Sequence, residues 1–367
     1  MKTKIEHFRN YMKELTTSNK LVGVSVAVTK GEDILYSEGF GYANIKEKKP
    51  ITPNTMVSIQ SISKSFISLA ILQLVEEGKI HLEHPVVTYL PYFQTKDKNM
   101  SDTITVKQLL THTAGFSLEM GVANSLAPNK EEYKKFHEFH KGIFQGKEEI
   151  SKKISSREDL TKYFAATNLE YVPGQEWEYF TDGYAILGDL FEKVSGEKWE
   201  LYLNREIVQK LRMSRTTTDF QDVIMDSNRA YYYTNKEEKF IQTPFPINSI
   251  SSPIGFIYST TNDMAKYLIA LLTKKNDLLQ SEMSFSYLYS DPFIIQDGIG
   301  YGLGWFVLPY KNYELIEHTG GFLGVSACAS MIPSEELGVI VLSNYDKTPI
   351  TEISHKLIDL FLDITID

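Results

Sequence analysis

The sequence has very little cysteine and no long apolar run. Its 367 residues include one cysteine, Cys328, so no disulfide can form within the chain and nothing indicates an oxidising compartment. Residues 1–8 have no apolar core of the kind that a signal peptide needs, and they predict the start of an amphipathic helix instead. No segment reaches the roughly 20 apolar residues of a transmembrane helix. We therefore expect a cytoplasmic protein, and we favour this over an exported form whose leader has been removed.

Basic residues are also fewer than acidic residues. The chain has 38 Lys and Arg against 47 Asp and Glu, which gives a net charge of -9. This balance argues against nucleic acid and against an anionic membrane surface as partners. The remaining composition, 42% hydrophobic and 23% charged, is that of an ordinary globular protein, and the length fits one large domain or two interleaved ones.

Strand-like segments lie near both ends of the chain. Residues 24–29 and 34–37 flank a turn and predict a β-hairpin. Further strands are expected close to the C-terminus, followed by a helix, at residues 314–317, 326–332 and 338–342 and then 352–362, with a turn at 333–336. We therefore expect an α/β (α+β) fold, in which an antiparallel β-sheet is flanked by N- and C-terminal helices and a large, mainly helical region is inserted.

The expected domain boundaries follow from this division. Residues 1–60 and 290–367 would form a sheet-plus-helix domain, residues 61–289 a mainly helical domain, and the active site would lie at their interface. Residues 120–158 are rich in Lys and Glu and lack clear periodicity, which indicates a surface excursion or a lid.

The most apolar helical stretch begins beside a serine and a lysine. Ser61 and Lys64 are three residues apart and precede residues 66–75, which are apolar on nearly every face and stop at Gly78. Residues at this spacing share a helix face, so a hydroxyl and an amine would meet at the positive end of a buried helix. Such a pair can activate a serine as a nucleophile.

Further phrases give this S-x-x-K pair a context. The chain reads QLLTHTAG over 108–115, PGQEWEYFTDGYAILG over 173–188, STTNDM over 259–264, GYGLGW over 300–305 and EHTGGF over 317–322. In this order the phrases resemble the serine β-lactamase-related family, which includes class C β-lactamases, D,D-peptidases, penicillin-binding proteins, D-aminopeptidases and related esterases. That family is marked by S-x-x-K, then Y-x-N, then K-T-G or H-x-G. The resemblance runs from about residue 20 to about residue 345.

The resemblance implies a role for each matching residue. Ser61 would attack a carbonyl, with Lys64 or Tyr179 as the base; which of the two acts in each step stays open. His318, where the family usually has a second lysine, would add positive charge at low pH and a neutral hydrogen-bonding partner near pH 7. The backbone amides of Ser61 and Gly321 would form the oxyanion hole. The Gly320–Gly321 pair predicts a tight backbone turn against substrate.

One position departs from the family pattern. Thr181 stands where Y-x-N has asparagine, and its hydroxyl is shorter and offers one donor instead of two. Recognition of a β-lactam or a peptide acylamide group is thereby put in doubt, and the weight shifts toward esters or unusual amides. Thr181 joins Thr319, Gly320 and Tyr301 as a candidate for lining the substrate pocket.

Several residues also have a structural interpretation. Ser61 and Lys64 could be a helix cap and a solvated lysine, Tyr179 could pack in a core, and His318 could simply be satisfied by a neighbour. Tyr184 fits the core of the following helix. His112 is interpreted as structural, and His81 and His84 as solvated surface without a third metal ligand, so no metal and no cofactor are expected.

The leading hypothesis is a serine hydrolase of the esterase or D-amino-acid peptidase type that forms an acyl-enzyme on Ser61. Its partners would be small ester, amide or D-peptide substrates; the oligomeric state is not predicted. A penicillin-binding protein or β-lactamase acting on β-lactams or cell-wall peptides is the alternative within the same fold. A catalytically weak binding or regulatory protein that retains the fold is the alternative from another class.

Overall fold

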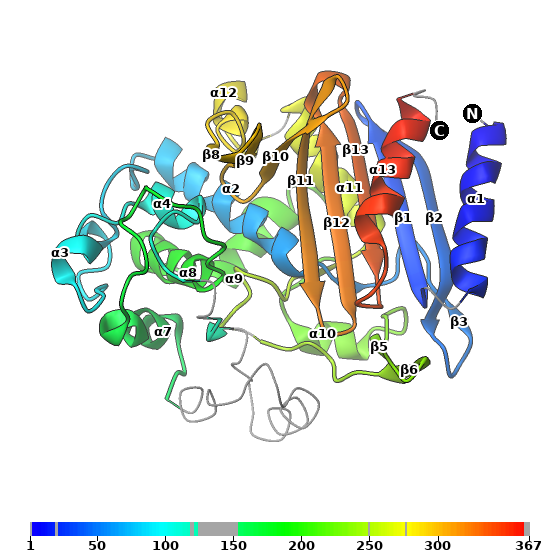
Figure 1. Cartoon of the computed structure of the whole chain (residues 1–367), viewed down its shortest axis with the longest axis horizontal. Coiled ribbons are helices and arrows are strands. Elements are labelled where there is room, and N and C mark those ends of the chain that lie inside the picture. Colours follow the sequence, from blue (N-terminus) through cyan, green and yellow to red (C-terminus); the bar gives the residue numbers. More distant parts are fainter. Residues whose placement is uncertain are drawn as a thin grey trace.

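A nine-stranded antiparallel sheet, built from both ends of the chain, forms one half of the molecule (Figure 1). The computed structural model describes residues 2–18, 21–117, 121–123, 153–248, 250–275 and 277–362. Within these residues the strand order is β3-β2-β1-β13-β12-β11-β10-β9-β8, so a strand near the N-terminus pairs with one near the C-terminus. The strands are β1 Gly23–Lys30, β2 Asp33–Asn44, β3 Lys49–Pro50, β8 Phe293–Gln296, β9 Ile299–Tyr301, β10 Phe306–Tyr310, β11 Tyr313–Phe322, β12 Val325–Ile332 and β13 Leu337–Ser343.

Helices cover both faces of this sheet. Helices α1 (Lys2–Thr17) and α13 (Ile350–Phe361) lie on one face, where Phe8, Met12 and Leu357 are buried against the strands. Helix α11 (Thr261–Thr273) packs on the opposite face against β1 and β13. Because side chains on both faces are covered, every residue of β12 and β13 is buried, which explains their nearly unbroken apolar sequences.

The other half of the molecule is mainly helical and is built around α2 (Ser63–Glu76). This helix is buried over twelve of its residues and packs against α8 (Asp182–Ser195). It stops where Gly78 adopts a φ of +70°, a conformation that glycine adopts without strain. The remaining helical segments are η1 Gln60–Ile62, η2 Val86–Thr88, α3 Lys98–Ser101, α4 Val106–Leu110, α7 Arg157–Tyr163, η5 Phe164–Ala166, α9 Trp199–Tyr202, the π-helix η6 Leu203–Val208, α10 Phe220–Met225, α12 Glu282–Ser286 and η7 Pro333–Glu335. Two small two-stranded sheets pair β4 Val57–Ser58 with β7 Tyr258–Ser259, which are distant in the chain, and β5 Tyr233–Lys236 with β6 Lys239–Gln242, which form a hairpin.

The predicted fold class is confirmed, and so are the hairpin, the C-terminal strands and the helices at both ends. The division at residues 60 and 290 stays a prediction. Within the inserted range, α11 packs on the sheet, and its Tyr267 also stacks on Phe66 of α2 with ring centroids 4.0 Å apart. Of residues 120–158, the structure describes 121–123 and 153–158, so the predicted lid lies outside the described residues. None of the described helices is both long enough and apolar enough to cross a membrane.

Candidate active site

Ser61 lies in the short 3₁₀ turn η1 that leads into α2. The sequence places it in the first turn of the long helix, whereas in the structure α2 begins two residues later. The preceding residue, Gln60, has a φ of +47°, which is a strained conformation for a residue with a Cβ, and its side-chain amide donates to Ser58 Oγ at 2.7 Å. This bent entry leaves Ser61 half-buried, at the open end of an otherwise buried helix.

Lys64 is completely buried behind the serine. Its Nζ lies 3.0 Å from Ser61 Oγ and 3.0 Å from the backbone oxygen of Ile254. Burial lowers the pKa of the amine to about 7, although the negative charge of Asp182 acts in the opposite direction. Near neutral pH a large fraction of this amine is therefore unprotonated and able to accept a proton.

Tyr179 covers the amine from the side of the helical half. Lys64 Nζ lies 5.1 Å from the centroid of the Tyr179 ring. Burial raises the pKa of Tyr179 to about 12, against the opposing effect of hydrogen bonds with the side chains of Ser61 and Thr181. The phenol is therefore protonated at neutral pH and can act as a proton donor beside the serine.

His318 approaches the same amine from strand β11. Its Nδ1 donates to the backbone oxygen of Thr319 at 2.7 Å, and its Nε2 accepts from the Tyr301 hydroxyl at 3.0 Å. Burial, followed by the charge of Lys64, lowers the pKa of His318 to about 3. The positive charge that the sequence predicts for His318 at low pH is therefore confined to strongly acidic solution. Tyr301 is itself fully buried behind the imidazole, so it does not line an open pocket as the sequence predicts.

Strand β11 runs past the serine with alternate residues exposed. Thr319 and Gly321 are exposed and Gly320 is buried. A Cβ on Gly320 would lie 2.3 Å from the backbone oxygen of Ile59, so only glycine lets this strand approach η1 so closely. The strand continues through Phe322 and pairs with β12 along the whole stretch, so the tight turn predicted at Gly320–Gly321 is wrong.

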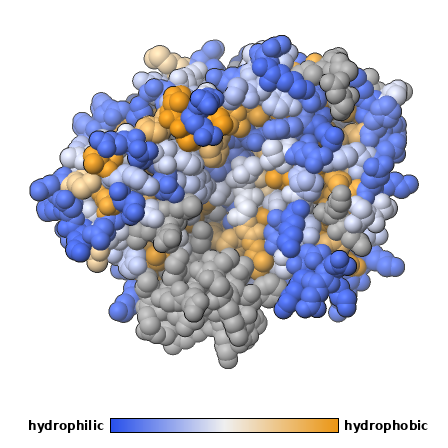
Figure 2. All heavy atoms as spheres, viewed as in Figure 1, coloured by the Kyte–Doolittle hydropathy of each residue, from blue (hydrophilic) through white to orange (hydrophobic). Residues whose placement is uncertain are grey.

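The far edge of β11 is open at this point. Strand β10 pairs with β11 only as far as Glu317, so the edge from His318 onward faces η1 and not another strand. A Cβ on Gly321 would meet nothing within 4 Å. This opening lies between the strands and the helical half, where Figure 2 shows a hollow in the surface.

The structure thus brings together Ser61 of η1, Lys64 of α2, His318 of β11 and Tyr179 from the segment before α8. Tyr184 is excluded from this group, because its hydroxyl donates to the backbone oxygen of Leu110 inside the core. Sequence reasoning misses Gln60, the carbonyl of Ile254 and the charge of Asp182. A glutamine gives no sign of positive φ and a backbone carbonyl has no sequence signature, but an acidic residue directly after Thr181 could have been noticed.

Metal-binding groups do not gather here. The described residues contain no cluster of three or more His, Cys, Asp or Glu that could hold a metal ion. The rings of His81 and His84 stack on each other with centroids 4.6 Å apart, away from the serine.

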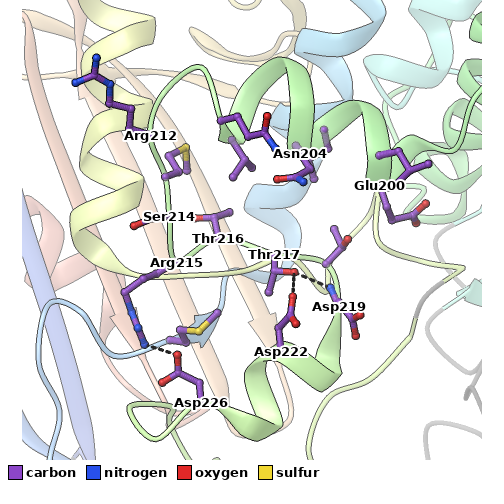
Figure 3. Close-up of a pocket in the computed structure, with 17 residues that line it drawn as sticks. Glu200, Asn204, Arg212, Ser214, Arg215, Thr216, Thr217, Asp219, Asp222 and Asp226 are labelled. Carbon is purple, nitrogen blue, oxygen red and sulfur yellow. Dashed lines mark hydrogen bonds and ion pairs between the residues drawn. The ribbon is translucent and has the colours of Figure 1, made fainter.

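A separate cavity of about 760 Å³ lies in the helical half (Figure 3). Its polar side chains are largely satisfied by one another: Arg215 pairs with Asp226 at 2.8 Å, and Thr217 donates to Asp222 at 3.1 Å. None of the candidate catalytic residues lines it. Hydroxyl and carboxylate side chains line it, but no lysine lies beside a hydroxyl there as Lys64 does at Ser61, so we take the cluster at Ser61 as the candidate active site.

This fold, with a serine–lysine pair at the start of a buried helix, defines a class of protein related to the serine β-lactamases. A family model described as Beta-lactamase matches residues 8–361, and the chain belongs to that family. Protein flp of Staphylococcus aureus (strain COL) is 23% identical over 339 residues, which cover 91% of this chain and 62% of flp. The chain thus spans less than two thirds of the length of this curated relative.

Solved structures agree with the family assignment. The octameric penicillin-binding protein homologue from Pyrococcus abyssi is 27% identical and superposes with a TM-score of 0.80, covering 98% of this chain and 78% of that one. A D-stereospecific amidohydrolase from Streptomyces sp. is 21% identical with a TM-score of 0.74, covering 94% and 95% of the two chains. The second likeness concerns the fold alone.

Proposed function

We propose that this protein is a serine hydrolase that forms an acyl-enzyme on Ser61. The observation that carries the proposal is the 3.0 Å approach of a fully buried amine, with its pKa lowered to about 7, to a half-exposed serine hydroxyl. A buried amine of this kind has little structural use, because it has no bonded carboxylate to compensate its charge. It is well suited to accept a proton at neutral pH.

In the acylation step, Lys64 Nζ takes the proton of Ser61 Oγ while Oγ forms a bond to the substrate's carbonyl carbon. The electron pair of the carbonyl π bond moves to its oxygen, which the backbone amides of Ser61 and Gly321 would stabilise. When the tetrahedral intermediate collapses, Tyr179 donates its proton to the leaving group and regains one from Lys64. In deacylation, Tyr179 takes a proton from the attacking water molecule and passes its own proton to Lys64. Lys64 then protonates Ser61 Oγ as the bond between Oγ and the acyl carbon breaks, which releases the acid and restores the free enzyme. The pKa values support this division of labour, since Tyr179 stays a phenol where Lys64 is partly a free amine.

The proposed substrates are small esters and D-amino-acid amides. Thr181 precedes α8 beside Tyr179 and presents one short hydroxyl with a single donor hydrogen. An asparagine side chain reaches further and offers an acylamide group two donor hydrogens and a separate acceptor oxygen. We expect Thr181→Asn to raise reactivity toward β-lactams and acylated D-peptides more than toward simple esters.

A penicillin-binding protein is the second candidate, and the 27% identity to the Pyrococcus abyssi homologue favours it. Fluorescent penicillin should then label the parent protein but not Ser61→Ala. If no label appears and nitrocefin stays intact, this candidate is excluded.

The main test is hydrolysis of p-nitrophenyl acetate by the parent protein and by Ser61→Ala, with the acyl adduct followed by intact mass spectrometry. The variant should lose the adduct and the initial burst of p-nitrophenol. Ser65→Ala is a matched control, because Ser65 lies four residues further on, in α2, where its hydroxyl donates to the Ile62 carbonyl and accepts from the Tyr267 hydroxyl. An unreactive parent protein would favour the third possibility, a binding or regulatory protein that retains the fold.

A further inference from the structure

His112 lies directly behind Tyr179 and contacts the chain on both sides of it. The backbone oxygen of His112 accepts from the amide of Glu178 at 3.0 Å, and its Nδ1 accepts from the amide of Phe180 at 3.2 Å. The imidazole also packs on the Tyr179 ring, with centroids 4.4 Å apart. The residues before and after Tyr179, and its ring, are therefore all held by one side chain and its backbone.

The backbone of His112 lies in the left-handed region. Its φ is +59°, which glycine adopts most easily and which asparagine, aspartate and histidine adopt more often than other residues with a Cβ. Glycine or asparagine would therefore serve equally well if this residue only ended α4. The bond to Glu178 needs nothing but a backbone oxygen, whereas the bond to Phe180 needs an acceptor at the position of Nδ1.

The other ring nitrogen of His112, Nε2, is left in an unfavourable environment when Nδ1 accepts a hydrogen bond. When Nδ1 accepts, the neutral imidazole carries its proton on Nε2. Nε2 is buried and has no hydrogen-bonding partner among the described residues, since the ring lies between those of Tyr179, Tyr184 and Tyr301 at centroid distances of 4.4, 5.1 and 4.8 Å. A buried donor without a partner is unfavourable and rare. Because this unfavourable donor is tolerated, we take the hydrogen bond from the Phe180 amide to Nδ1 as the reason for a histidine at this position.

We infer that His112 is a positioning residue that fixes the Tyr179 hydroxyl against Ser61 and Lys64. This inference rests on the proposed function, in which Tyr179 transfers a proton. Without the contacts from His112, Tyr179 would remain in place in the fold but its hydroxyl would move relative to Ser61. A displacement of about 1 Å can lower the rate on the order of a hundredfold.

The test compares three substitutions at one position. His112→Asn keeps a hydrogen-bond acceptor near the position of Nδ1 and tolerates the positive φ. His112→Gln moves the acceptor toward the position of Nε2. His112→Gly also tolerates the positive φ but has no side-chain acceptor. With p-nitrophenyl acetate as the substrate, we expect His112→Asn to keep most of kcat. The other two should lose roughly tenfold or more in kcat with little change in KM.

The same three substitutions in a Tyr179→Phe background separate positioning from general folding. There they should differ from one another by no more than about twofold, because the hydroxyl that they position is gone. An equal loss in both backgrounds, a His112→Asn variant no better than His112→Gly, or a His112→Asn variant that does not fold would overturn the inference. If Tyr179→Phe keeps the parental kcat, or Ser61→Ala stays active, it is the proposed function that fails.

Discussion

Two buried cations in the helical half have opposite surroundings. Arg157 at the start of α7 is paired with two carboxylates, those of Glu192 at 2.6 Å and Glu200, and it also donates to Ser252 and the Ile250 carbonyl. Lys64 is buried more completely, and the partners bonded to its amine are a hydroxyl and a carbonyl. The first cation ties α7, α8 and α9 together, whereas the second lies beside a nucleophile.

The difference shows how burial produces either structure or chemistry. A guanidinium stays charged under any ordinary condition, so two carboxylates are needed to offset its desolvation. Burial acts to raise the pKa of Glu200, yet the charge and hydrogen bond of Arg157 keep it below the usual value. An amine can instead release its proton, and without a bonded carboxylate Lys64 does so near pH 7.

The largest expected effect is that of Lys64→Met, which should abolish acylation and make the protein more stable. General-base catalysis contributes roughly 10²–10⁴-fold, and that factor should be lost in the p-nitrophenol burst. Below pH 7 the amine is protonated in the folded and the unfolded chain alike, so the folded state carries the full cost of a buried charge. That cost falls as the pH rises from 7 toward 10.5, because the folded protein then holds fewer protons than the unfolded chain.

Thermal unfolding at pH 6 and pH 9 measures the second half of this prediction. The gain in Tm over the parent should be larger at pH 6. The exposed Lys98, which pairs with Asp102 on the surface, supplies the control substitution Lys98→Met. A Lys64→Met protein that is less stable than the parent at pH 6 would refute the inference that the buried charge of Lys64 destabilises the fold.

Arg157→Met should have the opposite outcome, a large loss of stability with turnover retained in the folded protein. Removing one member of a buried ionic network costs roughly 3–5 kcal/mol, because the remaining carboxylates stay buried without their partner. Urea unfolding measures the loss. Arg205→Met is a matched control, since Arg205 also contacts two carboxylates, Glu197 and Glu206, but is half-exposed and should cost little. Retained stability together with lost turnover would place Arg157 in the catalytic machinery instead.

This contrast marks the limit of what the sequence predicts. The sheet from both ends, the buried helix at Ser61 and the family motifs are predictable, because apolar periodicity and short fixed spacings are local properties. The Ser61–Lys64 contact is local as well, since residues three apart meet on one helical turn.

The environment of that contact is not local. Ile254 reaches Lys64 from 190 residues further along the chain, and Tyr301 of β9 donates to His318 of β11 from the other side of β10. No spacing rule predicts that burial and the charge of Lys64 lower the pKa of this histidine to about 3, so the positive charge predicted for it at low pH is confined to strongly acidic solution. The turn expected at Gly320–Gly321 fails for a related reason: Gly320 allows a close approach to Ile59, which no local pattern shows.

The pH dependence of acylation is the next test of the unpaired amine. With Lys64 as the base, kcat/KM should fall about tenfold per unit below a midpoint near pH 7. His318 and Tyr179, with pKa values lowered to about 3 and raised to about 12, should add no further limb between pH 5 and 9. Lys64→Arg keeps its charge and should be inactive at every pH in this range; an active Arg variant would mean that another group takes the proton.

The smallest effect concerns the one carboxylate that Lys64 does sense. Asp182 raises the pKa of the amine through its charge, while its two oxygens accept from the amides of Val122 and Ala123 at 2.9 Å each. Asp182→Asn removes the charge, so the pKa of Lys64 should fall and the midpoint of kcat/KM should move below 7. Because an asparagine has one acceptor oxygen, the variant should also lose about 1–3 kcal/mol of stability.

Asp189→Asn separates these two consequences. Asp189 lies on the same helix and accepts from the hydroxyls of Thr161 and Tyr92, so its substitution should lower stability without moving the midpoint. If Asp182→Asn shifts the midpoint and Asp189→Asn does not, the pKa of Lys64 is set by burial, which lowers it, and by the distant charge of Asp182, which raises it. Lys64 and Arg157 then differ in how closely a carboxylate approaches. If neither variant shifts the midpoint, burial alone sets the pKa of Lys64, and a carboxylate affects Arg157 but not Lys64.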